Sequence, residues 1–169
     1  MTFNLAALEA KLGHVPGGRA LTQQVTYAQF VIDRSGSMLH LTSKMEESLQ
    51  AQLAAMRSAP ANVEYRVGAV PFGSRVNPFT GWVHPSDQPQ YPCTANLGET
   101  ALYDAMNDAI TRAEAKLLEE PDAAHLIIVI TDGYNNHSLL TSTGLTTRVK
   151  TSMASDRVTV VVNCPPGSQ

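Results

Sequence analysis

Three hard oxygen donors occupy every second position of residues 33–37, which read Asp-Arg-Ser-Gly-Ser. In an extended backbone, residues i, i+2 and i+4 face the same side, so Asp33, Ser35 and Ser37 can converge on one point. One carboxylate and two hydroxyls suit a hard cation such as Mg²⁺, which prefers oxygen ligands. Because the apolar run 25–32 comes directly before this segment, the sequence predicts a cation site at the end of a strand.

Two further segments place oxygen donors beside predicted elements. Thr100 opens the run Thr-Ala-Leu-Tyr-Asp-Ala, and Asp132 follows the apolar run 125–131 and precedes Gly133. In parallel α/β sheets, ligands bind beyond the carboxyl ends of the strands. Asp33 and Asp132 both lie at such ends, and Thr100 lies just before a predicted helix on the same side. We therefore expect the three segments to meet at one edge of the sheet.

The elements that must position these donors alternate between strands and helices. We predict strands at about 24–32, 63–72, 125–131 and 157–163, and helices at about 38–57, 101–119 and 143–154. Such alternation is typical of parallel β-α-β units with right-handed crossovers. Residues 73–99 hold four prolines, which exclude a long helix, and 75–84 is expected to form a short antiparallel edge strand or hairpin.

Composition places the chain among ordinary globular proteins. Its 169 residues are 43% hydrophobic and 16% charged, which fits one domain at 24–169 preceded by an N-terminal helix and linker at 1–23. The net charge of -3 argues against a nucleic-acid partner, and no apolar run is long enough for a membrane partner. Cys93 and Cys164 form no metal motif, so a reduced, cytoplasmic setting is the expectation.

The three donor segments together resemble the von Willebrand factor A domain with a complete metal-ion-dependent adhesion site, of the intracellular bacterial or phage type. The likeness covers roughly residues 24–163 and departs from the family at Gly98-Glu99, where a Gly-Gly pair is common. It implies an α/β, Rossmann-like three-layer sandwich: a mostly parallel sheet flanked by helices, with a short antiparallel edge strand. It also implies bound Mg²⁺ or Mn²⁺. The implied metal ligands are Asp33, Ser35, Ser37, Thr100 and Asp132, the serines directly and the aspartates largely through water.

The function expected from this resemblance is a non-enzymatic, metal-dependent protein-interaction module. Two carboxylates and three uncharged hydroxyls leave a coordination position for an outside oxygen. The partial positive charge of an adjacent helix N-terminus, about half a unit, favours an anion there. A partner protein that presents Asp or Glu would complete the shell. Candidates for the rim of the site are Met38, Leu39, His40, Asn96, Leu97, Glu99, Tyr134, Asn135 and His137.

Other interpretations of the same residues remain open. Taken alone, Ser37 or Thr100 is more often a helix N-cap, and Asp132-Gly133 an ordinary turn. One alternative function is a Mg²⁺-dependent phosphatase-like enzyme with Asp33 as nucleophile. Such an enzyme also needs a lysine in its site, which would be Lys116 or Lys150. Another is a structural assembly protein whose metal only stabilises the fold.

The last predicted strand raises a separate question about partners. Members of the family usually continue with another strand and a helix, which this sequence is expected to lack. Residues 158–162 would then form an exposed sheet edge, and bare edges promote strand pairing between molecules. We expect this edge to be covered by the N-terminal helix, by a partner or by a second copy, which would give an oligomer or assembly.

Overall fold

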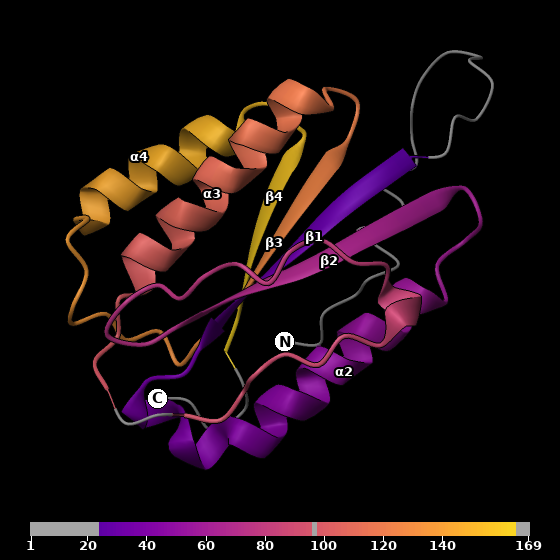
Figure 1. Cartoon of the computed structure of the whole chain (residues 1–169). Helices are drawn as coiled ribbons and strands as arrows, with labels where there is room; N and C mark the ends of the chain where they lie inside the picture. The colour runs from indigo at the N-terminus through magenta and orange to yellow at the C-terminus, as the bar shows by residue number, and fades with distance from the viewer. Residues whose placement is uncertain (1–23, 96–97, 165–169) are drawn as a thin grey trace.

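A computed structural model describes residues 24–95 and 98–164 of the protein. These residues form an α/β sandwich of three layers. All four strands are parallel, in the order β2-β1-β3-β4. The strands are β1 (Gln24–Asp33), β2 (Val63–Phe72), β3 (Ala124–Ile130) and β4 (Val158–Asn163). One face is covered by α2 (Thr42–Arg57) and the other by α3 (Leu102–Glu119) and α4 (Ser142–Met153), as Figure 1 shows. The predicted fold class is confirmed.

Two hydrophobic cores hold the layers together, one on each face of the sheet. Phe30 and Leu53 belong to the core under α2, whereas Val31 and Ile110 belong to the core under α3 and α4. Consecutive residues of β1 therefore enter opposite cores, as the alternation of side chains along a strand requires. Every residue of β3 is buried, and all of them except His125 are apolar, as burial on both faces of a sheet favours. The central strands β1 and β3 are thus buried up to their carboxyl ends.

The helix predicted at 38–57 is divided into two parts. A 3₁₀-helix, η1 (Gly36–Leu41), precedes α2. Met38 and Leu41 are both buried, at 0% and 1% exposure. A spacing of three residues places two side chains on one side of a 3₁₀-helix, which has three residues per turn. The tighter turn therefore lets both residues enter the core directly after the donor segment.

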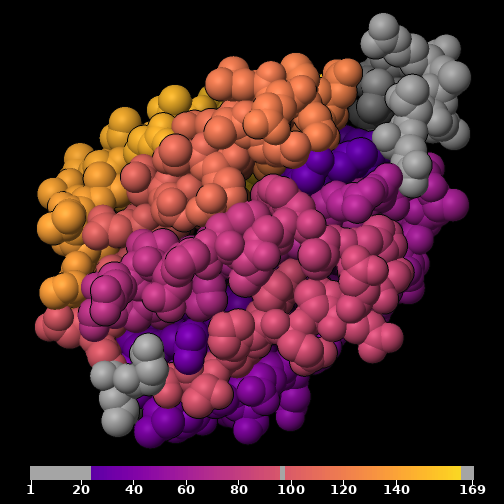
Figure 2. All heavy atoms as spheres, in the orientation of Figure 1, coloured from indigo at the N-terminus to yellow at the C-terminus, as the bar shows by residue number. Residues whose placement is uncertain are grey.

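The structure does not confirm the antiparallel edge strand expected at 75–84. Within the described residues, this segment has only two isolated antiparallel bridges, Phe72 with Val76 and Val67 with Val83. The Thr80 hydroxyl, rather than a backbone carbonyl, accepts from the Ala69 N–H at 2.9 Å, and Gly81 adopts a left-handed φ of 89°. These two features interrupt the regular series of backbone hydrogen bonds that a strand beside β2 would form. The segment nevertheless lies beside the edge strand β2, and Figure 2 shows this part of the chain at the surface between the two helical layers.

A side chain at Gly68 in β2 is expected to destabilise the protein, because the segment 75–84 lies directly against this residue. A Cβ atom at Gly68 would lie 2.4 Å from Cζ of Phe79 and 2.6 Å from the carbonyl oxygen of Gly81. Overpacking of this kind costs about 1–3 kcal/mol. We therefore expect Gly68→Ala to lower the free energy of unfolding in urea by about that amount. Adding Phe79→Leu should restore part of the loss, and a Gly68→Ala variant as stable as the wild type would contradict the packing described.

The opposite edge of the sheet is formed by β4, as the sequence predicted. No strand of the described residues pairs with its outer side, and Val162 is 53% exposed there. The N-terminal helix and linker, predicted at 1–23, lie outside the described residues. What covers this edge, and whether it forms an oligomer, therefore stays a prediction.

Two other expectations bear on the setting of the protein. None of the helices in the described ranges combines the length and the apolar character that crossing a membrane requires. Cys93 is buried and Cys164 is exposed, and both are free thiols.

Candidate metal centre

Asp33 ends β1 and is completely buried, with 0% exposure. Its Oδ1 accepts a hydrogen bond from the Ser35 N–H at 2.9 Å, and its Oδ2 accepts one from the Thr131 hydroxyl at 2.7 Å. Thr131 is within reach because Ile32 and Ile130 are register partners in the adjacent strands β1 and β3. The carboxylate is therefore fixed at the carboxyl edge of the sheet by residues that directly follow two adjacent strands.

The two serine hydroxyls of the donor segment lie together. Ser35 Oγ is 3.1 Å from Ser37 Oγ, and Ser35 has extended backbone angles, φ -63° and ψ 166°. Neither serine caps a helix: Ser35 occupies the N-cap position of η1 without a side-chain hydrogen bond, and Leu41 occupies that of α2. The N-cap interpretation of Ser37 is therefore wrong. Ser35 is buried and Ser37 is exposed, so the pair leads from the interior to the surface.

Thr100 is buried at 2% exposure and belongs to a loop that contacts the donor segment. The Gly36 N–H donates to the Gly98 carbonyl at 3.1 Å, which joins the two segments directly. The N-cap of α3 is Ala101, without a side-chain hydrogen bond. The interpretation of Thr100 as the N-cap is therefore also wrong, and a capping role does not occupy its hydroxyl.

Asp132 follows β3 and is 7% exposed. Its Oδ1 accepts from the Tyr134 N–H at 3.2 Å, and Gly133 has a φ of 91°, so this segment does form the tight turn that its sequence suggests. Burial raises the pKa of the Asp33 carboxyl, and the nearby charge of Asp132 raises it further, against the hydrogen bonds from Ser35 and Thr131 that lower it. Two carboxylates thus share one small region, where the charge of Asp132 disfavours ionisation of Asp33.

The donor chemistry of this region suits a hard divalent cation. Among residues 24–95 and 98–164, no ion pair joins Asp33 or Asp132 to a basic side chain. The same residues contain no group of three His, Cys, Asp or Glu side chains that could hold a metal. A metal here would depend on hydroxyl oxygens in addition to the two carboxylates, which are ligands of the kind that Mg²⁺ and Mn²⁺ accept.

The predicted rim residues are only partly where the sequence placed them. Leu39 and Tyr134 are exposed at 56% and 54%, and His137 Nδ1 lies 2.5 Å from a carboxylate oxygen of Glu99. His40 is also exposed. Met38 is wrong as a rim residue, because it has 0% exposure and packs in the core under α2.

The sequence did not reveal every residue that shapes this region, and one of its rim candidates has a structural role. Asn135, a rim candidate, accepts through Oδ1 from the Tyr103 N–H at 3.3 Å, so part of its side chain serves the fold. Thr131 and Asn136 were not singled out, although each forms a hydrogen bond to a site residue. The position of Thr131 directly before Asp132 was an available signal. The rim candidates Asn96 and Leu97 lie outside the described residues.

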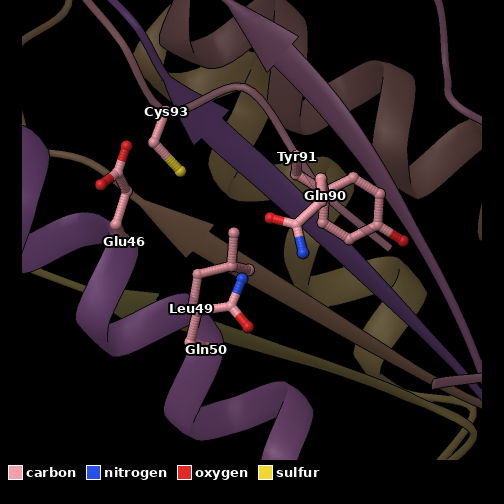
Figure 3. A pocket seen from close by; sticks show the side chains of 6 residues that line it. All are labelled: Glu46, Leu49, Gln50, Gln90, Tyr91 and Cys93. Carbon is pink, nitrogen blue, oxygen red and sulfur yellow. The ribbon is translucent and has the colours of Figure 1, made fainter. Parts of the chain in front are cut away.

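A separate hollow of about 340 Å³ lies between α2 and residues 90–93 (Figure 3). Burial, together with the charge of Glu46, raises the pKa of the Cys93 thiol to about 11. A thiol with this pKa is protonated at neutral pH and is a poor nucleophile. The residues that line the hollow are Glu46, Leu49, Gln50, Gln90, Tyr91 and Cys93.

Comparison with known proteins finds relatives in structure alone, since no family model and no curated protein matches the sequence. The manganese-loaded TRAP protein of Plasmodium vivax has a TM-score of 0.59 at 14% identity, covering 87% of this chain and 59% of that one. Proximal thread matrix protein 1 from the mussel byssus, with a zinc-occupied MIDAS motif, has a TM-score of 0.60 at 17% identity, covering 84% and 38%. The pilus adhesin SpaC of Lactobacillus rhamnosus GG has a TM-score of 0.61 at 14% identity, covering 82% and 24%.

This chain spans less than two thirds of the length of each of these proteins. At such low identity the likeness concerns the fold, which most of this chain shares with von Willebrand factor A-domain proteins. Two of the three structures contain a divalent metal, manganese in one and zinc in the other. The described chain has a von Willebrand factor A-like fold.

Proposed function

We propose that this protein is a metal-dependent protein-interaction module that binds Mg²⁺ or Mn²⁺ through Asp33, Ser35, Ser37, Thr100 and Asp132. The observation that carries the proposal is the completely buried Asp33 carboxylate, which lies near Asp132 and is paired with no basic side chain of the described residues. Leaving such charges unneutralised is costly, and a divalent cation removes the cost. The metal in the similar structures supports the same conclusion.

The partner of this module is a protein that presents an Asp or Glu carboxylate. Two carboxylates balance a divalent cation only formally, and the three hydroxyls add no charge. Mg²⁺ requires six oxygen ligands and usually keeps several waters. Of the donors, Ser37 is the exposed one, so a partner would reach the site from its side. The N-terminus of α3, which begins two residues after Thr100, adds a field that favours an anion.

Affinity capture tests this function directly. Immobilised protein should retain its partner in Mg²⁺, release it in EDTA, and fail to retain it when it carries Asp33→Ala. Replacing the partner's acidic residues by the corresponding amides, one at a time, should identify one whose loss abolishes binding. An affinity that EDTA leaves unchanged would refute the proposal.

The phosphatase-like alternative is less well supported. The Asp33 carboxylate has 0% exposure, whereas a nucleophile must be reached directly by its substrate. Lys116 pairs with Glu120 at 2.8 Å and lies 5.1 Å from the Tyr27 ring. Tyr27 precedes Asp33 by six residues of β1, a distance of about 20 Å in a strand. A phosphatase assay in Mg²⁺ distinguishes the two functions: activity that Asp33→Asn removes would favour the enzyme.

The third candidate function is a structural assembly protein in which the metal only stabilises the fold. Ser35→Ala separates it from an interaction module. In a structural protein this variant lowers the melting temperature in Mg²⁺ without a separate binding defect. In an interaction module it weakens partner binding even at temperatures where the variant is fully folded. We also propose a cytoplasmic setting, which the two free cysteines support.

A further inference from the structure

We propose that Asn136 is a positioning residue of the metal centre, which acts by fixing the backbone of Thr100. This inference rests on the proposed function, because it concerns the affinity of that centre for its cation. Asn136 follows Asp132 by four residues and is absent from the set of metal ligands proposed above. Its role is therefore indirect and follows from its contacts with Thr100.

Three hydrogen bonds join the loop after Asp132 to the peptide groups of Thr100. Asn136 Oδ1 accepts from the Thr100 N–H at 2.7 Å. The Thr100 carbonyl accepts from the N–H groups of Asn136 and His137, each at 3.1 Å. Both the donor and the acceptor of the Thr100 backbone are thus satisfied by one neighbouring loop. Among these bonds, only the one to Asn136 Oδ1 depends on a side chain.

The same loop is also fastened to the first turn of α3. Ser138 Oγ accepts from the Tyr103 N–H at 2.9 Å, and the Asp104 carboxylate accepts from the N–H groups of Leu139 and Leu140 at 2.8 and 2.9 Å. Ser138 thereby does the work of an N-cap side chain, which Ala101 at the N-cap position of α3 does not supply. The loop, Thr100 and the beginning of α3 therefore form one connected unit.

This connection has a direct consequence for the metal ligands. Thr100 and Asp132 come from segments that are far apart in the sequence, and the loop that Asn136 belongs to makes their positions depend on one another. Outer residues that orient metal ligands typically contribute 10–100-fold to metal affinity. Removal of the Asn136 side chain frees the Thr100 N–H and leaves its hydroxyl less well placed for a cation.

The test compares Mn²⁺ affinity in a matched pair of variants, with free Mn²⁺ measured by electron paramagnetic resonance. Asn136→Ala should weaken Mn²⁺ binding about 10- to 100-fold. Ser138→Ala loses a bond between the same loop and α3 but none to Thr100, so its affinity should stay within about 3-fold of the wild type. Asn136→Asp keeps the acceptor for the Thr100 N–H and should restore most of the affinity.

Amide hydrogen exchange adds a readout that does not involve metal. In metal-free protein, Asn136→Ala should accelerate exchange at the Thr100 N–H, whereas Ser138→Ala should accelerate it at Tyr103. Equal Mn²⁺ affinity of the wild type and Asn136→Ala would overturn the inference, as would equal losses in Asn136→Ala and Ser138→Ala. If the wild type itself binds no Mn²⁺, the proposed function fails instead, and the exchange result still reports whether Asn136 fixes Thr100.

Discussion

The Asp33→Asn variant is expected to lose cation binding and yet to be more stable than the wild type when no metal is present. The wild-type carboxylate is completely buried, and burial and the charge of Asp132 both raise its pKa. A group whose pKa is raised by folding destabilises the folded protein once the pH is high enough to ionise it. Asparagine has nearly the same shape without the charge, so it removes this penalty and also removes the attraction for a cation.

Thermal unfolding in EDTA and in excess Mg²⁺ measures both halves of this expectation. For the wild type, a cation at 100 times its dissociation constant adds about 2.7 kcal/mol to the free energy of unfolding. For Asp33→Asn the added Mg²⁺ should change the melting temperature little, and Mn²⁺ affinity should fall at least about 100-fold, the upper end of the range for outer residues. In EDTA, the melting temperature of the variant should exceed that of the wild type.

Asp122→Asn serves as the control, because Asp122 is exposed and lies outside the donor segments. It should retain the full response to Mg²⁺. If Asp33→Asn keeps that response, Asp33 is not part of a cation site. If it is instead less stable than the wild type in EDTA, the hydrogen bonds to Ser35 and Thr131 outweigh the cost of the buried charge.

His125 is expected to make the protein lose stability as the pH falls from about 6.5 to about 4. Its side chain is 3% exposed, its Nε2 has no hydrogen-bond partner, and its ring stacks on Tyr27 at a centroid distance of 5.2 Å. Burial lowers the pKa of His125 to about 4, with a further lowering by the charge of Lys116 and an opposing effect of Glu120. The neutral imidazole is therefore the form that the folded protein accepts.

The direction of the effect follows from the order of the two pKa values. The unfolded chain takes up the proton near pH 6.5, while the folded protein resists protonation until about pH 4. The free energy of unfolding therefore falls across this interval, by an amount on the order of 3 kcal/mol, and does not fall further once both states are protonated. Above pH 7 both states are neutral, so the effect is absent.

Urea unfolding at a series of pH values between 4 and 8 measures this loss. His125→Phe preserves an aromatic ring against Tyr27 and cannot titrate, so its free energy of unfolding should depend less on pH by about the amount given above. Taking the difference between variant and wild type cancels the contribution of the carboxylates. The exposed His40→Gln variant should follow the wild type. Parallel curves for the wild type and His125→Phe would show that His125 does not titrate as described.

Most of the architecture could be predicted from the hydrophobic pattern. The strands at 24–32 and 125–131 were recognisable because burial on both faces of a sheet requires a nearly unbroken apolar run. The start of the helix after Ser37 was predicted less well. A 3₁₀ turn and an α-helix both fit the apolar residues Met38 and Leu41, and only contact with the core selects the tighter turn. The edge strand predicted near 75–84 was not confirmed. The Thr80 hydroxyl and the left-handed backbone of Gly81 interrupt the ladder of backbone hydrogen bonds there.

The sequence by itself determined the donor types and their spacing. It also determined that Asp33 and Asp132 each lie at the carboxyl end of a strongly apolar strand, because a nearly unbroken apolar run is typical of a strand buried on both faces. Only the tertiary structure decided that Thr131 binds Asp33, that Met38 turns inward and that Asn136 holds Thr100. These contacts join residues separated by tens of positions, and each depends on the register of strands and the course of loops. Local sequence preference carries no information on which distant residues meet, because such contacts form only when the packed layers bring separate segments together.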